Sequence, residues 1–297
     1  MKNNINKQLP DGIRYISRAD REFPQKLREL SDCPQGLYVR GELPDPKKKT
    51  VAVVGARMCT PAGRAEAFYF AQVLAANDVQ VISGLALGID GAAHEGALFA
   101  GGKTFAVLAG GVDICYPRAN IGLYEQMKTA GGLISEEPPG FPSLSKMFPK
   151  RNRIISGFAD LVLVVEARER SGSLITADYA CEQGKDIFAV PGRLGDELSR
   201  GCNELIFQGA GLALSPERLL EIMGKKEKKS DNSKNFVQNV LAREEDMVYS
   251  CLSLQPKGLE NLCKDTGLSP VCTAEAVMKL QLRGLVKEIG RNRYVKT

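Results

Sequence analysis

From residue 51 onward, short apolar segments alternate with alanine-rich segments of helical periodicity, and glycine-rich turns separate them. This alternation constrains the fold most strongly, because strands that alternate with helices form parallel sheets covered on both faces. The apolar segments predict strands at 51–54, 79–82, 104–108, 132–134, 161–165 and 186–190. The other segments predict helices at 61–77, 89–100, 120–130, 151–159, 173–182 and 203–208. The fold class is therefore α/β, with a doubly wound and mostly parallel sheet.

The chain is predicted to have four parts. Residues 1–49 form an N-terminal lead-in, and residues 50–223 form the α/β domain. The segment 224–235 contains no apolar residue, which predicts a flexible linker. In residues 236–297 the apolar spacing fits three helices followed by a two-stranded hairpin, which is typical of a small winged-helix domain.

The predicted hairpin is rich in cations. These are Arg283, Lys287, Arg291, Arg293 and Lys296. Their charges could contact the backbone of a DNA duplex. They could equally form a solvated face, and the C-terminal unit could bind a protein instead.

Composition excludes several classes of protein. Eight cysteines without a Cys-x-x-Cys pair, together with a single histidine, indicate neither a zinc site nor a disulfide framework, and no cofactor is expected. No apolar run approaches the roughly 18 residues of a membrane span, and the N-terminus lacks the apolar stretch of a secretory signal. We therefore expect a cytoplasmic protein with no membrane partner. The net charge of +5 only hints at polyanion binding.

A basic cluster precedes one of the predicted strands. Lys150, Arg151 and Arg153 stand shortly before the segment 161–165, whose continuous apolar pattern indicates a parallel strand buried on both faces. Cations just before a buried strand are predicted to be held in fixed positions by the fold rather than to be merely solvated. After the strand, Ser-Gly-Ser at 171–173 opens a helical segment, and free backbone N–H groups at a helix start bind anions. The arrangement suits a ligand that carries phosphate.

Two further turns are predicted at the same edge of the sheet. The strand at 51–54 leads to Arg57, and the strand at 79–82 leads to Ser83 and Gly84. Ligands of open α/β sheets bind at the carboxyl ends of the strands, so these turns are predicted to form a phosphate cradle that contains Arg57. Arg57 could instead pair with a nearby carboxylate.

The turns do not match a standard nucleotide-binding motif. Neither supplies G-x-G-x-x-G, and the Gly-Lys-Thr at 102–104 leads from helix into strand, which is the reverse of a P-loop. NAD binding is therefore disfavoured. His94 lacks an accompanying nucleophile or carboxylate pair, which favours a structural role over catalysis. Glu166, after the strand at 161–165, is predicted to position a cation of the crevice.

Six ordered motifs together resemble the DNA-processing protein A family of bacteria. They are VGAR at 54–57, SGLALGID with AAH at 83–94, AGGVDICYPRAN at 109–120, SEEPPG at 135–140, FPKRNRIISG at 148–157 and SGSLITADYACEQGKDIFAVPG at 171–192. The resemblance covers nearly the whole chain. It implies an extended Rossmann-like fold, binding of single-stranded DNA, a homodimer, and loading of the RecA recombinase onto DNA taken up in natural transformation.

The resemblance also implies which residues form a DNA pocket. They are Arg57, Ser83, Gly84, Lys150, Arg151, Asn152, Arg153, Ser171, Gly172, Ser173 and Thr176. Arginine side chains would bind phosphate oxygens, the amides at 171–173 would bind another phosphate, and Phe148 could stack against a base. Arg153 could instead hold Glu166 and form part of the pocket wall.

Three functional hypotheses follow. The main one is a non-enzymatic binder whose crevice admits a single strand, with the two pockets of a dimer engaging one strand. The second is an enzyme similar to the lysine-decarboxylase-like nucleoside-monophosphate phosphoribohydrolases, whose PGGxGTxxE pattern carries a catalytic glutamate. This chain has SGSLITADYA at the corresponding turn and lacks that glutamate. The third is a nucleotide-sensing binding module.

Overall fold

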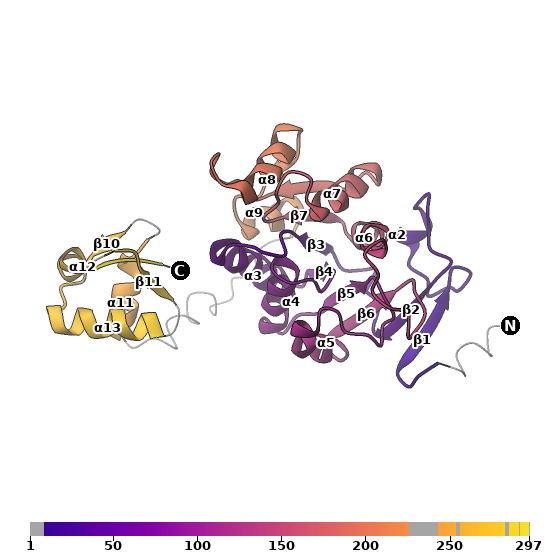
Figure 1. Cartoon of the computed structure of the whole chain (residues 1–297), viewed down its shortest axis with the longest axis horizontal. Coiled ribbons are helices and arrows are strands. Elements are labelled where there is room, and N and C mark those ends of the chain that lie inside the picture. Colours follow the sequence, from indigo (N-terminus) through magenta and orange to yellow (C-terminus); the bar gives the residue numbers. More distant parts are fainter. Residues whose placement is uncertain (1–8, 226–242, 254–255, 283–284, 291, 297) are drawn as a thin grey trace. The chain divides into compact units, whose positions relative to one another are not determined.

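The computed structural model describes residues 9–225, 243–253, 256–282, 285–290 and 292–296. The chain divides into two compact units, residues 1–227 and 228–297. The first unit carries a nine-stranded sheet with helices on both faces, and the described residues of the second form three helices and a three-stranded sheet (Figure 1). In the described part of the chain, no helix has both the length and the apolar character needed to cross a bilayer.

The strands of the first unit follow the order β1-β2-β6-β5-β4-β3-β7-β8-β9. Strands β3 to β9 pair in parallel, whereas β1 and β2 are antiparallel to their neighbours. The bounds are β1 Ile13–Ser17, β2 Gly36–Gly41, β3 Thr50–Val54, β4 Gln80–Ser83, β5 Thr104–Leu108, β6 Gly131–Ser135, β7 Leu161–Val164, β8 Asp186–Ala189 and β9 Gly211–Leu212. The prediction of a mostly parallel α/β sheet is confirmed.

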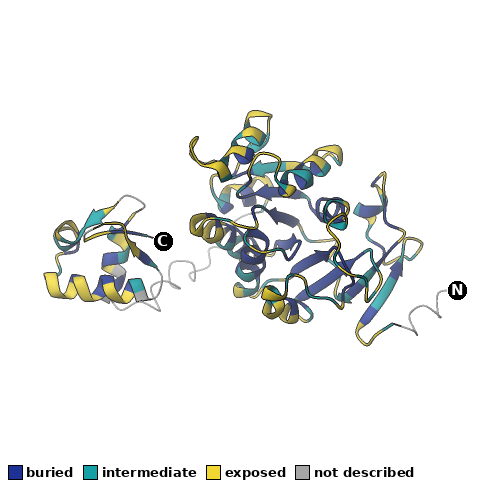
Figure 2. Ribbon diagram, in the orientation of Figure 1, coloured by how far each residue is buried: buried dark blue, intermediate teal, exposed yellow. Residues whose placement is uncertain are grey.

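Apolar cores fill both faces of this sheet. Along β3, Val51 and Val53 lie in one core and Ala52 and Val54 in the other, because successive side chains of a strand face opposite sides. The first face is covered by α3 (Pro61–Ala76), α4 (Ile89–Phe99), α5 (Ile121–Met127) and α9 (Pro216–Ile222). The second is covered by α2 (Gln25–Arg28), α6 (Met147–Phe158), α7 (Gly172–Glu182) and α8 (Glu197–Phe207). The sheet is therefore doubly wound, and its central strands are buried (Figure 2).

Three details of the sequence prediction need correction. The segment 1–49, predicted as a lead-in with a helix near 24–30 and a strand at 36–40, contains α2 and β2 at these places, but it also supplies β1, and both strands belong to the sheet beside β6. Helix α8 begins at Glu197 rather than at residue 203. Helix α6 begins at Met147 rather than at residue 151. Pro149 is tolerated in its first turn, because the backbone N–H groups of a first turn have no partner within the helix. The cations of the basic cluster therefore lie along α6 itself.

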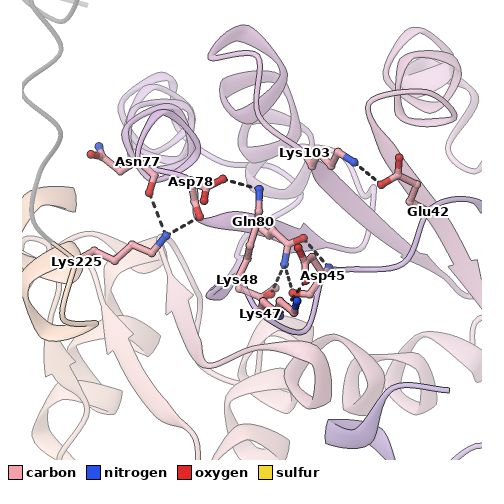
Figure 3. Close-up of polar contacts among 10 residues, drawn as sticks. Glu42, Asp45, Lys47, Lys48, Asn77, Asp78, Gln80, Lys103 and Lys225 are labelled. Atoms are coloured by element: carbon pink, nitrogen blue, oxygen red, sulfur yellow. Dashed lines mark hydrogen bonds and ion pairs between the residues drawn. The ribbon is translucent and has the colours of Figure 1, made fainter. Parts of the chain in front are cut away.

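The chain end of the first unit is anchored at the amino-terminal edge of the sheet (Figure 3). Lys225 donates from Nζ to the backbone oxygens of Asn77 and Asp78, which follow α3. The side chain of Asp78 in turn pairs with Lys48 at 2.6 Å. These contacts satisfy carbonyls at a helix end, where cations are favoured. Of the predicted linker at 224–235, only the first two residues lie within the described part of the chain.

The second unit is built around a small core of its own. Its elements are α11 (Arg243–Cys251), β10 (Lys257–Gly258), α12 (Leu259–Thr266), α13 (Pro270–Leu282), β11 (Val286–Glu288) and β12 (Arg293–Lys296). Side chains from all three helices and from the β11–β12 hairpin meet in the core, including Val248, Leu262 and Leu280. β10 adds a third strand to the predicted hairpin. The winged-helix assignment stays a prediction, and Arg283 and Arg291 lie outside the described residues.

Candidate functional site

A cavity of about 260 Å³ opens at the carboxyl edge of the first unit's sheet. It lies where β3 ends, between β4 on one side and β7 on the other. The chain runs from β3 to β4 and β5 in one direction and from β7 to β8 and β9 in the other, which makes this a topological switch point. Ligands of open α/β sheets bind at such points. We call this cavity the switch-point pocket.

The pocket gathers eight of the twelve predicted site residues. They are Arg57, Phe148, Arg151, Asn152, Ser171, Gly172, Ser173 and Thr176. They come from the turn after β3, from α6 and from the start of α7. The other four, Ser83, Gly84, Lys150 and Arg153, lie outside the lining and have other contacts.

Arg57 is the exposed cation of the pocket. Its guanidinium lies 4.8 Å from the centre of the Phe148 ring, a distance at which a cation and an aromatic face attract each other. In the described part of the chain it has no carboxylate partner, so the alternative of an Arg57 ion pair is not met. A guanidinium held by an aromatic ring and free of a counter-charge is available to an incoming anion.

Arg151 plays a different part from Arg57. Its side chain is buried, and Nη1 donates to the backbone oxygens of Gly84, at 2.8 Å, and Val107. Burial lowers the pKa of Arg151 to about 10, with Asp90 opposing and Arg57 adding to the shift, so the group stays charged at neutral pH. Sequence reasoning placed Arg151 among the phosphate ligands. The structure gives its guanidinium a second task, which is to hold two strand ends together.

Asp90 is a pocket residue that sequence reasoning missed. It is buried, and Oδ2 accepts hydrogen bonds from the backbone N–H groups of Gly84 at 3.0 Å and Ala86 at 3.4 Å. Burial raises the pKa of Asp90, while the charge of Arg151 and these bonds lower it. Asp90 and Arg151 thus hold the same turn after β4, one by its N–H groups and the other by a carbonyl. An acidic residue at the start of a helix, shortly after a turn of small residues, was the available signal.

The start of α7 forms the opposite wall. Ser171 caps the helix, since its Oγ accepts from the Ser173 N–H and lies 2.7 Å from the Ser173 Oγ. Asn152 donates from Nδ2 to the Gly172 oxygen at 3.1 Å and ties α6 to this turn. Gly172 has open space around it. The N–H groups of Ser171 and Ser173 already donate, to the Arg168 oxygen and to the Ser171 Oγ, so among the described amides at 171–173 the Gly172 N–H is the one left for an anion.

The remaining predicted residues support the walls. Ser83 is fully buried and donates to the Val53 oxygen at 2.6 Å, and Gly84 lies directly against the Arg151 guanidinium. Lys150 faces away from the pocket and pairs with Glu136 at 3.1 Å and with Glu137 at 3.5 Å. These three residues shape or flank the pocket rather than lining it.

Arg153 and Glu166 do not interact as the sequence suggested. Arg153 is 4% exposed and pairs with Asp32 at 2.6 Å and with Glu136 at 2.9 Å. Glu166 instead accepts hydrogen bonds from the N–H of Thr60 at 2.8 Å and from its hydroxyl. Glu166 therefore braces the cap of α3 and does not position a cation of the crevice. The partner Asp32 is remote in sequence, so spacing could not reveal it.

His94 is buried behind the pocket and has a structural role. Its Nδ1 lies 2.7 Å from the Thr104 hydroxyl, which itself donates to the Val81 oxygen, so Nδ1 carries the proton of a neutral ring. Burial, together with the charge of Arg151, lowers the pKa of His94 to about 3. This ring is therefore neutral in the folded state at any ordinary pH.

The pH dependence of folding should report this histidine. Because its folded pKa lies below the unfolded value near 6.5, the unfolded chain takes up a proton first as the pH falls. The stabilisation is present above pH 6.5 and is lost progressively between pH 6.5 and about 3. We expect up to about 1.4 kcal/mol lost per pH unit in that range. Urea unfolding of the wild type and His94→Gln between pH 7 and 5 should show a steeper fall for the wild type, and parallel curves would contradict the assignment.

Fold and site together define an α/β protein with a doubly wound sheet and a cationic, aromatic pocket at its switch point. The chain belongs to the family of DNA recombination-mediator protein A, whose sequence profile matches residues 14–224. This confirms the family to which the sequence motifs pointed.

Relatives cover the first unit most closely. DNA processing protein DprA of Streptococcus pneumoniae is 45% identical over 205 residues, which are 69% of this chain and 72% of that protein. Protein Smf of Escherichia coli is 46% identical over 209 residues, which are 70% of this chain but only 56% of that protein. A considerable part of the Escherichia coli relative thus has no counterpart in the aligned region.

Two solved structures share the fold. The structure of DNA processing protein A from Streptococcus pneumoniae has a TM-score of 0.68 and 42% identity, covering 73% of this chain and 75% of that one. DNA processing protein A from Helicobacter pylori, reported with a unique single-stranded DNA binding mode, has a TM-score of 0.63 and 28% identity, covering 71% of this chain and 95% of that one. Both support an extended Rossmann-like fold for the first unit.

Proposed function

We propose that this protein is a cytoplasmic, non-enzymatic binder of single-stranded DNA that acts in DNA processing during natural transformation. One observation carries the proposal. The exposed Arg57, free of a counter-charge, lies over Phe148 in a pocket that also contains the first turn of α7. Single-stranded nucleic-acid sites combine cations with aromatic faces, and backbone N–H groups contribute further contacts to phosphates.

The size of the pocket supports a single strand rather than a duplex. A cavity of about 260 Å³ has room for one nucleotide unit. In this proposal a base stacks on Phe148, and its phosphate contacts Arg57 and the Gly172 N–H. The reported DNA-binding mode of the Helicobacter pylori relative supports the same ligand class.

Two finer parts of the proposal come from the family resemblance. We propose that two copies of the chain form a homodimer, so that two pockets engage one strand with greater avidity than either alone. We also propose that the bound strand is passed to the RecA recombinase. Recovery of RecA filament formation on strands coated with a competing binder is the measurement that tests this step.

The charge of the pocket favours binding over hydrolysis. Asp90 is the one carboxylate among its described lining residues, and its Oδ2 is already engaged by two backbone N–H groups. The position where the phosphoribohydrolases carry a catalytic glutamate lies in SGSLITADYA, which lacks one. Release of free base from nucleoside monophosphates would favour the enzyme hypothesis instead.

The salt dependence of binding tests the proposal. If about three to five phosphates are neutralised at each site, the log–log slope of affinity against salt should be about −2 to −3.5 for single strands. We expect fluorescence anisotropy to give tighter binding of labelled single-stranded than double-stranded oligonucleotides across the salt series. A slope near zero, or a preference for duplex, would overturn the proposed function.

A further inference from the structure

A second cavity, of about 540 Å³, lies in the first unit between β2, α5 and the loop that follows β5. Arg40 of β2 and Lys128, just after α5, line it. The loop contributes Asp113 and Arg118. None of these residues belongs to the switch-point pocket. We call this cavity the β5-loop pocket.

The charges of the β5-loop pocket do not cancel. Lys128 is neutralised by Glu125, which its Nζ contacts at 2.5 Å. Both oxygens of Asp113 accept from the Gly140 N–H at 2.9 Å, but the carboxylate keeps its negative charge, so three cations against two carboxylates leave the lining with one surplus positive charge. Arg40 contacts the Tyr124 hydroxyl, which is uncharged. Two guanidiniums, those of Arg40 and Arg118, thus have no carboxylate partner among the described residues.

Two guanidiniums without an ion-pair partner, in a lining with one surplus positive charge, favour a phosphate. Each guanidinium presents its donors in a planar fork that matches two oxygens of a phosphate group. Arg118 is exposed and Arg40 is half-buried, so a ligand can reach both from solvent. A divalent cation would be repelled by the same charges.

The loop that lines the β5-loop pocket also contacts a lining residue of the switch-point pocket. Tyr116 lies in this loop and is 50% exposed, and its ring centre is 5.8 Å from that of Phe148 in the switch-point pocket. Arg118, two residues further along, lines the β5-loop pocket. The Arg57 guanidinium, the half-buried Phe148 ring and the exposed Tyr116 ring thus contact one another in sequence, and Arg118 follows Tyr116 two residues later in the chain. Successive bases of a strand can stack on such surfaces while the phosphates follow the cations.

We propose that a single strand leaving the switch-point pocket crosses Tyr116 and that one of its backbone phosphates is bound in the β5-loop pocket by Arg40 and Arg118. The inference rests on the proposed function and extends it. It assigns this protein a second phosphate site on the same strand. Affinity should therefore rise with strand length until both pockets are filled.

The test compares two strand lengths in Arg118→Ala. An oligonucleotide of about four nucleotides is short enough to occupy only the switch-point pocket, whereas one of about sixteen reaches both. We expect Arg118→Ala to weaken binding of the longer strand about tenfold, as for the loss of one charge-assisted contact. Its salt slope should fall in magnitude by about 0.7. Binding of the short strand should not change.

Matched variants separate the possible outcomes. Arg218→Ala removes an equal charge from exposed α9 and should leave both strands unaffected. Unchanged binding of the longer strand in Arg118→Ala would overturn the second site, and equal weakening of both lengths would overturn its separation from the first. Failure of the proposed function itself is distinguishable, because Arg57→Ala would then leave both lengths unaffected.

Inorganic phosphate distinguishes a strand phosphate from a free anion. In isothermal titration, we expect weak phosphate binding that Arg118→Ala reduces, together with the loss of affinity for the longer strand. Phosphate binding that is lost without any change in that affinity would assign the pocket to a free anion and overturn the strand path. Arg118 lies in an exposed turn, so its replacement should leave the unfolding free energy within about 0.5 kcal/mol of wild type, which checks that the variant is folded.

Discussion

Replacing Arg57 by alanine is expected to weaken binding of single-stranded DNA by about tenfold to a hundredfold, the range for loss of hydrogen bonds to a charged group. The side chain is exposed and has no carboxylate partner in the described part of the chain. Its loss should therefore lower the affinity for DNA and leave the free energy of unfolding unchanged. Its loss also removes the cation that Phe148 holds at the pocket. Fluorescence anisotropy with a labelled oligonucleotide at fixed salt measures the effect.

Two further variants sharpen this result. Arg168→Ala removes an exposed arginine that pairs with Glu197 outside the pocket, so it controls for net charge. Arg57→Lys keeps the charge but loses the planar fork, and it should bind with intermediate affinity. Wild-type affinity in Arg57→Ala would place the DNA site elsewhere, provided that its unfolding curve matches that of the wild type.

Replacing Arg151 by alanine is expected to destabilise the first unit by about 3–5 kcal/mol, as for removal of one member of a buried charged pair. The change leaves the carbonyls of Gly84 and Val107 without a donor and leaves the buried Asp90 without its nearby positive charge. Urea unfolding measures the loss as a lower midpoint with an unchanged slope. DNA binding should weaken too, as a consequence of the altered turn after β4.

Measurements of DNA affinity and of unfolding should therefore distinguish the roles of Arg57 and Arg151. Arg57→Ala loses affinity and keeps its stability, whereas Arg151→Ala loses both. Asp90→Asn gives a second view of the same turn, because the amide retains an acceptor oxygen for the Gly84 N–H but removes the charge opposite Arg151. If Arg151→Ala kept wild-type stability while losing DNA binding, Arg151 would be a direct phosphate ligand and not the brace described here.

The parallel core could be predicted because its signal is local. Each central strand is a continuous apolar segment next to a helix of clear periodicity, and its burial on both faces follows from that pattern. Strand β1 lacked this signal. It pairs only with β2 at the edge of the sheet, and Ile13 and Ile16 are buried while its other residues are half-buried. Its membership of the sheet depends on contacts far away in the sequence.

The same division between local and distant contacts holds for the site. Arg57 and the turn at 171–173 were predictable because the end of a strand and the start of a helix place them at the pocket. The partners of the other cations were not predictable from spacing. Arg153 finds Asp32 in the loop before β2. Arg151 finds the carbonyls at the ends of β4 and β5. Sequence therefore identified the cations but not which of them remain free.

The burial of the arginines of α6 has a consequence for the release of bound single-stranded DNA. Arg151 and Arg153 are 6% and 4% exposed, so mobile ions in the medium have little access to their guanidiniums. Arg57 stands in solvent, where small ions compete directly for it. A rise in ionic strength would thus dissociate the strand from the pocket at salt concentrations that leave the buried contacts of Arg151 and Arg153 intact. The strand could therefore be bound and released repeatedly while the fold of the first unit stays the same.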